Sequence, residues 1–251
     1  ARASTLRQEV LGVTQVVRQQ LRRTRLGPIE PGEGHSGLGQ GLQEQHAGHD
    51  REAGNFTGLR VSSGIDVYLK QGSDETISAE ADENLHEYIL TEIRDGVLHV
   101  YTEVNIRHAE MKRVYVTMKD IRSLRTSSAG DIIGETPVKT DELELSATSA
   151  GDIKLEVYAR FIEADISSSG DVTLTGEADK LDADLSSAGD LNAFGLEVRE
   201  ADVSASSAGD ASINVVERLR ARASSAGDIK YRANPKYIDA HSSRAGSISR
   251  K

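Results

Sequence analysis

A short segment, Ser-Ser-Ala-Gly-Asp followed by an apolar residue, recurs along the second half of this chain and constrains its fold more than any other feature. Self-similarity at a period of 18 to 21 residues is typical of a solenoid, in which each repeat buries its apolar side chains against its neighbours. Close copies occupy residues 127–132, 148–153, 167–172, 186–191, 206–211 and 224–229, and a degraded copy occupies residues 242–248.

The residues that precede each glycine alternate between apolar and polar side chains. Before Gly170, the apolar residues Ile162, Ala164 and Ile166 enclose Glu163 and Asp165. The same parity holds before the later glycines, and an apolar residue stands two positions after each one. Because side chains of a strand point to opposite faces in turn, this period of two predicts strands. We therefore predict an all-β parallel β-helix over residues 124–251, with about 19 residues per coil and, given its inward alanines, a narrow interior.

Residues 54–123 lack the repeat but show strand patterns, so we expect an irregular β region that caps the solenoid. The stretch Ile65–Leu69 alternates like a half-buried strand. Asp95 and Gly96 separate two apolar runs and predict a tight hairpin. Asp82 is placed to cap a short helix over residues 83–88.

Residues 1–53 differ in composition from the rest, since they are rich in Arg, Gln, Gly and His. We expect a disordered or linker tail here, with a basic amphipathic helix over Glu9–Leu26 as the alternative. The chain has no run of 18 apolar residues, so no membrane span is expected, and no signal peptide is visible.

Composition excludes several functions. The net charge of −10 argues against a general nucleic-acid binder, because neutralising phosphates requires a basic surface. The absence of cysteine excludes disulfides and thiolate metal sites.

The glycines of the repeat form the first set of candidate site residues, a structural turn ladder. Each glycine supplies a turn conformation that a Cβ would forbid, or allows close packing at a corner of the coil. The ladder consists of Gly130, Gly151, Gly170, Gly189, Gly209 and Gly227.

The aspartates that follow these glycines form the second set, and two interpretations stay open. In the first, each outward carboxylate accepts backbone N–H bonds at the turn, and the serines add hydroxyl ladders. In the second, the stacked carboxylates bind a row of hard cations such as calcium, which is the one cofactor that we consider. The ladder consists of Asp131, Asp152, Asp171, Asp190, Asp210 and Asp228.

A carbohydrate-cleaving enzyme is a weaker alternative. Glycan-cleaving sites use clustered acids and bases with aromatic platforms, whereas these acids form a regular ladder and the chain has no tryptophan. His86, His99, His108 and His241 stand apart from one another in the sequence. We therefore predict no catalytic residues.

Two stretches resemble a known family. They are Phe56–Leu69, which includes the Gly-Ile-Asp step at residues 64–66, and Ala79–Leu85. Together with the later repeats they resemble the auto-transporter adhesin head GIN domain family over residues 54–248, although Gly-Ile-Asn is the more typical step. The resemblance implies an exported β-helical protein of a bacterial cell envelope, located in the periplasm or on the outer surface, with no known catalytic residues.

The combined expectation is a non-catalytic surface module, adhesin-like, whose outer faces meet a protein or glycan partner. A calcium-stabilised rod and an intracellular scaffold are alternatives. We expect no nucleic-acid partner, contact with a membrane only through an anchor outside the visible sequence, and self-association as an open option. In the degraded last copy Arg244 falls at the inward parity, so we expect a polar end coil that limits further stacking.

Overall fold

The computed structural model describes residues 47–51, 54–82, 84–104, 106 and 111–251. The amphipathic helix and most of the tail expected over residues 1–53 lie outside these residues, although residues 47–51 form a strand. The described residues contain strands and turns but no helix, so no helix among them could cross a membrane.

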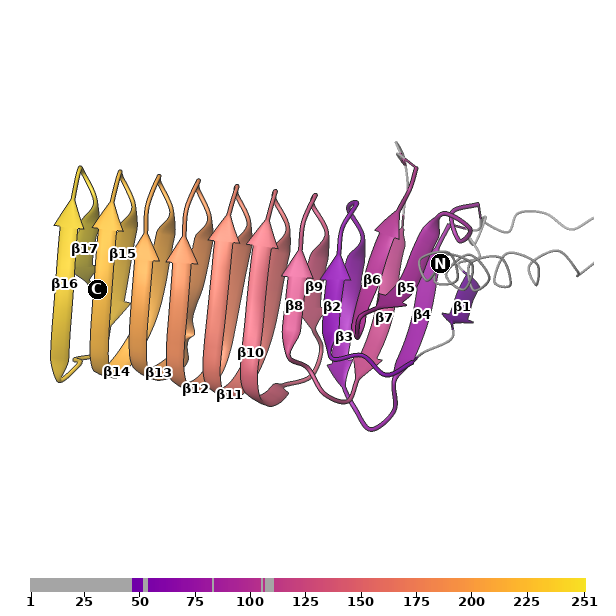
Figure 1. Ribbon diagram of the computed structural model, residues 1–251, viewed down its shortest axis with the longest axis horizontal. Helices are drawn as coiled ribbons and strands as arrows, with labels where there is room; N and C mark the ends of the chain where they lie inside the picture. The colour runs from indigo at the N-terminus through magenta and orange to yellow at the C-terminus, as the bar shows by residue number, and fades with distance from the viewer. Residues whose placement is uncertain (1–46, 52–53, 83, 105, 107–110) are drawn as a thin grey trace, which may run out of the picture. The chain divides into compact units, whose positions relative to one another are not determined.

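Seventeen strands follow one another along the described chain, and β11 to β14 each span a whole coil (Figure 1). They are β1 (Ala47–Arg51), β2 (Gly58–Val61), β3 (Asp66–Gln71), β4 (Thr76–Ala81), β5 (Ile89–Arg94), β6 (Val97–Thr102), β7 (Lys112–Met118), β8 (Ser123–Thr126), β9 (Asp131–Gly134), β10 (Val138–Thr148), β11 (Asp152–Ser167), β12 (Asp171–Leu185), β13 (Asp190–Ala205), β14 (Asp210–Ser224), β15 (Asp228–Arg232), β16 (Tyr237–Ser243) and β17 (Ser247–Arg250).

Each coil of the solenoid has two faces joined by a tight turn at one edge and a wider bend at the other (Figure 1). Strand β11 shows the plan. It leaves the turn at Asp152, runs along the first face, bends near Arg160 and returns along the second face to Ser167. Strands β10 to β14 stack in parallel with closely matched register, which confirms the predicted parallel β-helix. We call the wider bend the corner.

The stack continues N-terminal to the repeats. Strand β2 pairs with β8 on the second face, and β3 pairs with β9 on the first face, both in parallel. The later strands β6 and β7 lie on the outer side of β2 and β3, so the coils here do not follow chain order. The antiparallel strands β4 and β5 pair with β7 and β6, and β1 pairs with β4.

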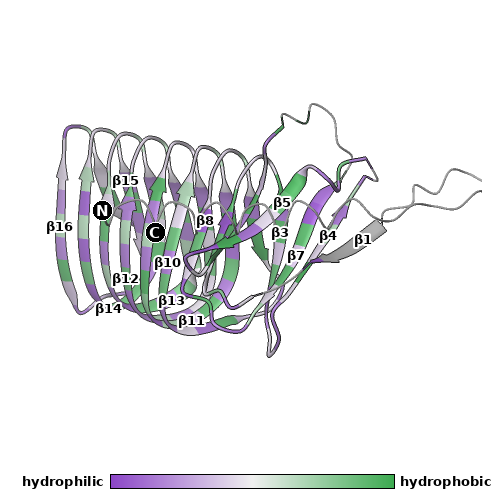
Figure 2. Ribbon diagram, turned by 45° about the vertical axis from the view of Figure 1, so that its right-hand side comes forward, coloured by the Kyte–Doolittle hydropathy of each residue, from purple (hydrophilic) through white to green (hydrophobic). Residues whose placement is uncertain are grey.

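The core consists of the inward side chains of the two faces, as the alternation predicts. Ile162, Ala164 and Ile166 are at most 1% exposed, whereas Glu163 and Asp165 between them are exposed. Hydrophobic and hydrophilic residues alternate along the strands, as Figure 2 shows. Alanines occupy many inward positions of the second face, and these small side chains are buried in a closely packed core between the two sheets.

Two local predictions are wrong and one is confirmed. Residues 84–88 form hydrogen-bonded turns after Asp82, not the expected helix. Arg244 is exposed in the last turn, because the strand parity does not continue through a turn. The hairpin at Asp95 and Gly96 is confirmed, with φ of 51° and 74° between antiparallel β5 and β6.

Candidate functional site

The repeated segment forms a column of tight turns along one edge. Ser187 and Ala188 have φ of 51° and 59°, and the Gly189 N–H donates to the Ser186 carbonyl at 3.0 Å. Two central residues with positive φ, closed by this hydrogen bond, are the pattern of a type I′ turn. The same pair of positive φ values recurs at residues 63–64, 128–129, 149–150, 168–169, 207–208, 225–226 and 244–245.

Successive turns are joined by backbone hydrogen bonds. The Ala188 N–H donates to the Ser207 carbonyl at 3.1 Å, and the Ala150 N–H donates to the Ser168 carbonyl at 3.1 Å. A left-handed conformation costs a residue with a Cβ about 1–2 kcal/mol. The bonds between turns, worth about 1 kcal/mol each, offset this cost. Backbone groups thus provide the ladder that we expected from serine hydroxyls.

Of the two roles predicted for the glycine ladder, the structure supports close packing, and this packing occurs at the tight turn and not at the corner. Its six glycines all lie outside the left-handed region, so the idea that they supply a special turn conformation is wrong. Instead, a Cβ on any of them would come within 3.1 Å of an atom of a neighbouring coil or its turn. Close packing between coils is therefore what requires glycine here.

The aspartates after these glycines form a column on the outside of the first face. Asp152, Asp171, Asp190, Asp210 and Asp228 are direct partners in the parallel register. Asp131 and also Asp66, which the repeat pattern missed, extend the column. The Asp131 carboxylate accepts the Asp152 N–H at 3.2 Å, so one predicted contact between carboxylate and backbone is present.

The column is electrostatically unfavourable in its middle. Burial first, and then the Asp152 carboxylate, raises the pKa of Asp171 above its ordinary value. Burial, followed by the charges of Asp171 and Asp210, raises the pKa of Asp190. The carboxylates stack singly, one per coil, and within the described part of the chain no three His, Cys, Asp or Glu side chains converge on one point.

A second column, which the sequence analysis missed, runs along the corner. Its side chains alternate in charge from coil to coil, and most neighbours form ion pairs. The guanidinium of Arg160 lies 3.8 Å from the carboxylate of Asp141. The guanidinium of Arg199 lies 3.4 Å from the carboxylates of both Asp179 and Glu217. The ammonium of Lys236 lies 3.7 Å from the carboxylate of Glu217. We call this set the corner ladder: Asp141, Arg160, Asp179, Arg199, Glu217 and Lys236.

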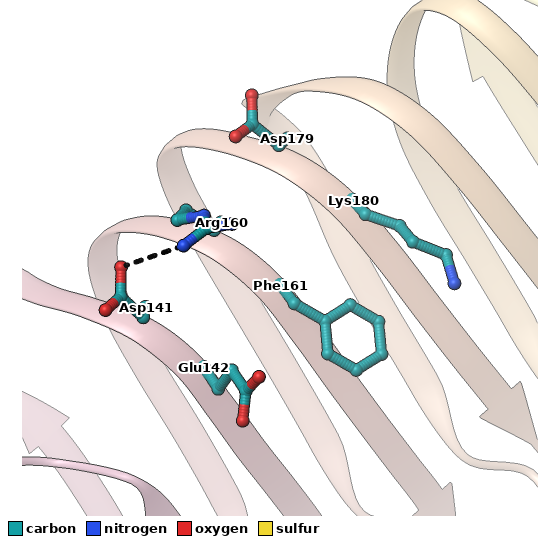
Figure 3. A pocket seen from close by; sticks show the side chains of 6 residues that line it. All are labelled: Asp141, Glu142, Arg160, Phe161, Asp179 and Lys180. Atoms are coloured by element: carbon teal, nitrogen blue, oxygen red, sulfur yellow. Dashed lines mark ion pairs between the residues drawn. The ribbon is translucent and has the colours of Figure 1, made fainter.

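The corner ladder borders open hollows on the surface. One, of about 350 Å³, is lined by Asp141, Glu142, Arg160, Phe161, Asp179 and Lys180. Figure 3 shows that these side chains come from successive coils, with Phe161 between Glu142 and Lys180. The Lys180 ammonium lies 4.9 Å from the centre of the Phe161 ring. A continuation of about 680 Å³ extends past Arg122 and Lys139.

A sequence signal for the corner ladder exists. Each member stands ten residues before a glycine of the repeat, and the signs read minus, plus, minus, plus, minus, plus. Counted back from each glycine, the alternation of apolar and polar residues ends eight residues before the glycine, two positions short of the corner-ladder residue. The strand pattern therefore did not include this residue.

The second face carries a broad acidic area between the corner and the turns. Glu163, Asp165, Asp182 and Asp184 point outward from β11 and β12. Burial raises the pKa of Asp182, and the Asp202, Asp184 and Asp165 charges add to this while Lys180 opposes it. The area therefore favours a positively charged neighbour.

Comparisons with known proteins agree with this architecture. Residues 55–235 match the family described as "Putative auto-transporter adhesin, head GIN domain". No curated protein matches the chain.

Several solved structures share the fold. A "putative adhesin" from Bacteroides fragilis has a TM-score of 0.75 at 18% identity, with 83% of this chain and 98% of that chain covered. A "putative adhesin" from Parabacteroides merdae has a TM-score of 0.65 at 21% identity, with 83% and 97% covered. A "putative lipid binding protein" from Parabacteroides distasonis has a TM-score of 0.64 at 20% identity, with 83% and 98% covered.

Proposed function

The chain belongs to the auto-transporter adhesin head GIN domain family, and on that premise we propose that it is a non-catalytic module of the bacterial cell envelope. In this proposal the solenoid is a rigid support whose outer face binds a protein or glycan partner. The observation that carries it is the second face, where outward side chains repeat once per coil on a flat sheet. A flat, regular surface suits an extended macromolecule better than a small substrate.

The charge of this face indicates the chemistry of the partner. Four carboxylates, of Glu163, Asp165, Asp182 and Asp184, lie together, and we find no ion pair between them and a basic side chain of the described residues. A partner that brings basic groups or many hydrogen-bond donors would lower their mutual repulsion.

Binding to arrays of glycans and of envelope proteins tests this proposal. The full chain is immobilised, and a variant with Asp165→Lys and Asp184→Lys is compared with Glu156→Lys, which reverses one charge on the first face. We expect binding that the double variant loses and the Glu156 variant keeps. Equal binding by all three proteins would contradict the role of the second face, and cleavage of any glycan on the array would contradict a non-catalytic module.

Export to the envelope is part of the same proposal. Fractionation of cells that express the full-length product should place it in the periplasmic or surface fraction. Recovery in the cytoplasm would favour the intracellular scaffold instead.

A calcium-stabilised rod is the second candidate, and the aligned aspartates favour it. Calcium prefers six to eight oxygen ligands, so each ion would have to recruit carboxylates from several coils together with water. A thermal melt with calcium and with a chelator tests it. A rise of the melting temperature with calcium that Asp171→Asn abolishes would support the rod, and identical melts would exclude it.

A further inference from the structure

We propose that the corner ladder is a self-complementary surface through which two copies of this chain pair side by side, with their solenoid axes antiparallel. This inference goes beyond the partner proposed above, because it uses the corner and not the second face. It rests on the order of charges along the ladder.

The order of charges makes the ladder complementary to a reversed copy of itself. A two-fold axis perpendicular to the sheets reverses the second copy, so the first member of one ladder meets the last member of the other. Because the six signs alternate, every facing pair then has opposite charge. Asp141 faces the Lys236 position, Arg160 faces Glu217, and Asp179 faces Arg199, each pair occurring twice.

The neighbouring column on the second-face side adds two further favourable pairs. It consists of Glu142, Phe161, Lys180, Glu200, Arg218 and Tyr237, in register with one another. Under the same two-fold axis Lys180 faces Glu200 of the other copy, and Phe161 faces Arg218. The first pair has opposite charges, and the second pairs a cation with a ring, as Arg218 and Tyr237 already do within one chain at 5.7 Å.

The corner side chains are accessible for such a contact. The charged groups of the ladder are 35% to 81% exposed, and their partners within the chain leave them largely hydrated. Parallel stacking with the same axis orientation would instead place each charge opposite its own sign, so the ladder selects the antiparallel arrangement.

One facing pair opposes the association. Glu177 and Glu197 form a column on the first-face side of the corner, and the two-fold axis sets them against each other. Their repulsion in water amounts to about 1 kcal/mol or less per pair. Replacing one of them with a base should therefore strengthen the pairing.

The contact is small, which sets the expected affinity. Six coils at about 4.8 Å extend over roughly 25 Å, and a width of three or four residues gives a few hundred Å² per copy. Interfaces below about 1,200 Å² in total form weak, transient complexes. The pairing is thus expected at high local concentration, such as that of a protein crowded on a surface.

Sedimentation equilibrium of the full chain up to about 1 mM, at about 0.15 M salt, tests the proposal. Under these conditions the repulsion between two copies, each with a net charge of −10, is screened beyond about 8 Å, whereas ion pairs in direct contact persist. Arg160→Glu alone and Glu217→Lys alone each create two like-charge pairs and should weaken dimerisation about tenfold or more. Lys154→Glu, a matched reversal on the first face, should not.

Mixing the two variants gives the decisive result. In the mixed dimer, Glu at position 160 of one copy faces Lys at position 217 of the other, and the remaining pair keeps its natural charges. Association should therefore return to the level of the natural chain. If the residues of the corner ladder acted only within one chain, mixing the variants would not restore association. Glu197→Lys should tighten the dimer about tenfold. A chain that stays monomeric, or a mixture that associates no better than its components, would overturn the proposal.

Discussion

Gly189 lies so close to the backbone of Ile166 in the preceding coil that the Cβ of an alanine at this position would stand 2.6 Å from the Ile166 carbonyl oxygen. The neighbour is a backbone atom that belongs to the hydrogen-bonded stack, so it cannot rotate away as a side chain would. The spacing between coils is therefore set at this edge by the absence of a side chain.

Gly189→Ala should accordingly lower the free energy of unfolding by about 3 kcal/mol, since the coils must separate locally to admit the methyl group. Urea titration followed by circular dichroism measures this. Ala188→Ser, one residue earlier on the exposed side of the same turn, serves as the control and should change stability by less than about 0.5 kcal/mol. Similar values for the two variants would mean that the glycine is not a packing requirement.

The strained residue of a turn offers a route to stabilisation. Ala208 has a φ of 63°, which disfavours a residue with a Cβ, while glycine adopts it freely. After subtraction of the extra freedom that glycine gains in the unfolded chain, Ala208→Gly should raise the free energy of unfolding by about 0.5–1 kcal/mol.

A matched control exists three residues earlier. Ala205 is 1% exposed and lies in the extended backbone of β13. Ala205→Gly should lower stability by about 1 kcal/mol, so the same chemical change should have opposite signs at the two positions. Thermal melts of both variants suffice, and a loss of stability in Ala208→Gly would show that the stacked turn does not strain its alanine.

Much of the solenoid could be predicted from the sequence, because its two determinants are local. The glycine period fixes the length of a coil, and the parity of residues such as Ile162 and Ala164 fixes which side chains face inward. The turn could be placed but not described. Turn preferences assign positive φ to glycine, whereas here Ser187 and Ala188 have it, because bonds to the next turn outweigh a local preference.

The remaining differences have a non-local cause. Strand β6 pairs with β2 although β3, β4 and β5 lie between them in the sequence, an arrangement set by which edge is free when the coils stack. No repeat marks this region, so nothing in the sequence reveals the order of its coils. The corner ladder became apparent only when the structure placed Asp141 beside Arg160, although the ten-residue offset from the glycines is visible in the sequence.

The aspartate column should make stability depend on pH in a defined direction. Burial, together with the charges of Asp171 and Asp210, raises the pKa of Asp190 above its ordinary value of 3.8. The folded state then binds a proton more readily than the unfolded state. This residue therefore opposes folding fully at neutral pH, and its penalty is lost as the pH falls through the raised pKa towards 3.8.

Asp190→Asn removes that penalty and should raise the free energy of unfolding at pH 7, by less than about 1 kcal/mol because the side chain is exposed. The advantage over the natural chain should shrink as the pH falls and vanish below about 3.5. Denaturant titrations of both proteins at several pH values measure the difference. An advantage that grows on acidification would mean that the carboxylate stabilises the folded state.

One buried hydroxyl lies in the apolar interior of the second face. Thr126 is 2% exposed, and its Oγ1 has no hydrogen-bond partner in the described structure. Its neighbours in the same inward position of adjacent coils are Val61 and Ala147, so the site accepts apolar side chains. By contrast, Thr148 donates its hydroxyl proton to the Thr126 carbonyl at 3.3 Å.

Thr126→Val should therefore raise the free energy of unfolding by about 1 kcal/mol, because a buried hydroxyl without a partner costs about 1–3 kcal/mol and valine has nearly the same shape. Thr148→Val is the matched control, and it should lower stability by about 1 kcal/mol because its hydrogen bond is lost. Urea titration at neutral pH measures both. If Thr126→Val proved as destabilising as Thr148→Val, the Thr126 hydroxyl would have to be bonded in solution, for example to a buried water molecule.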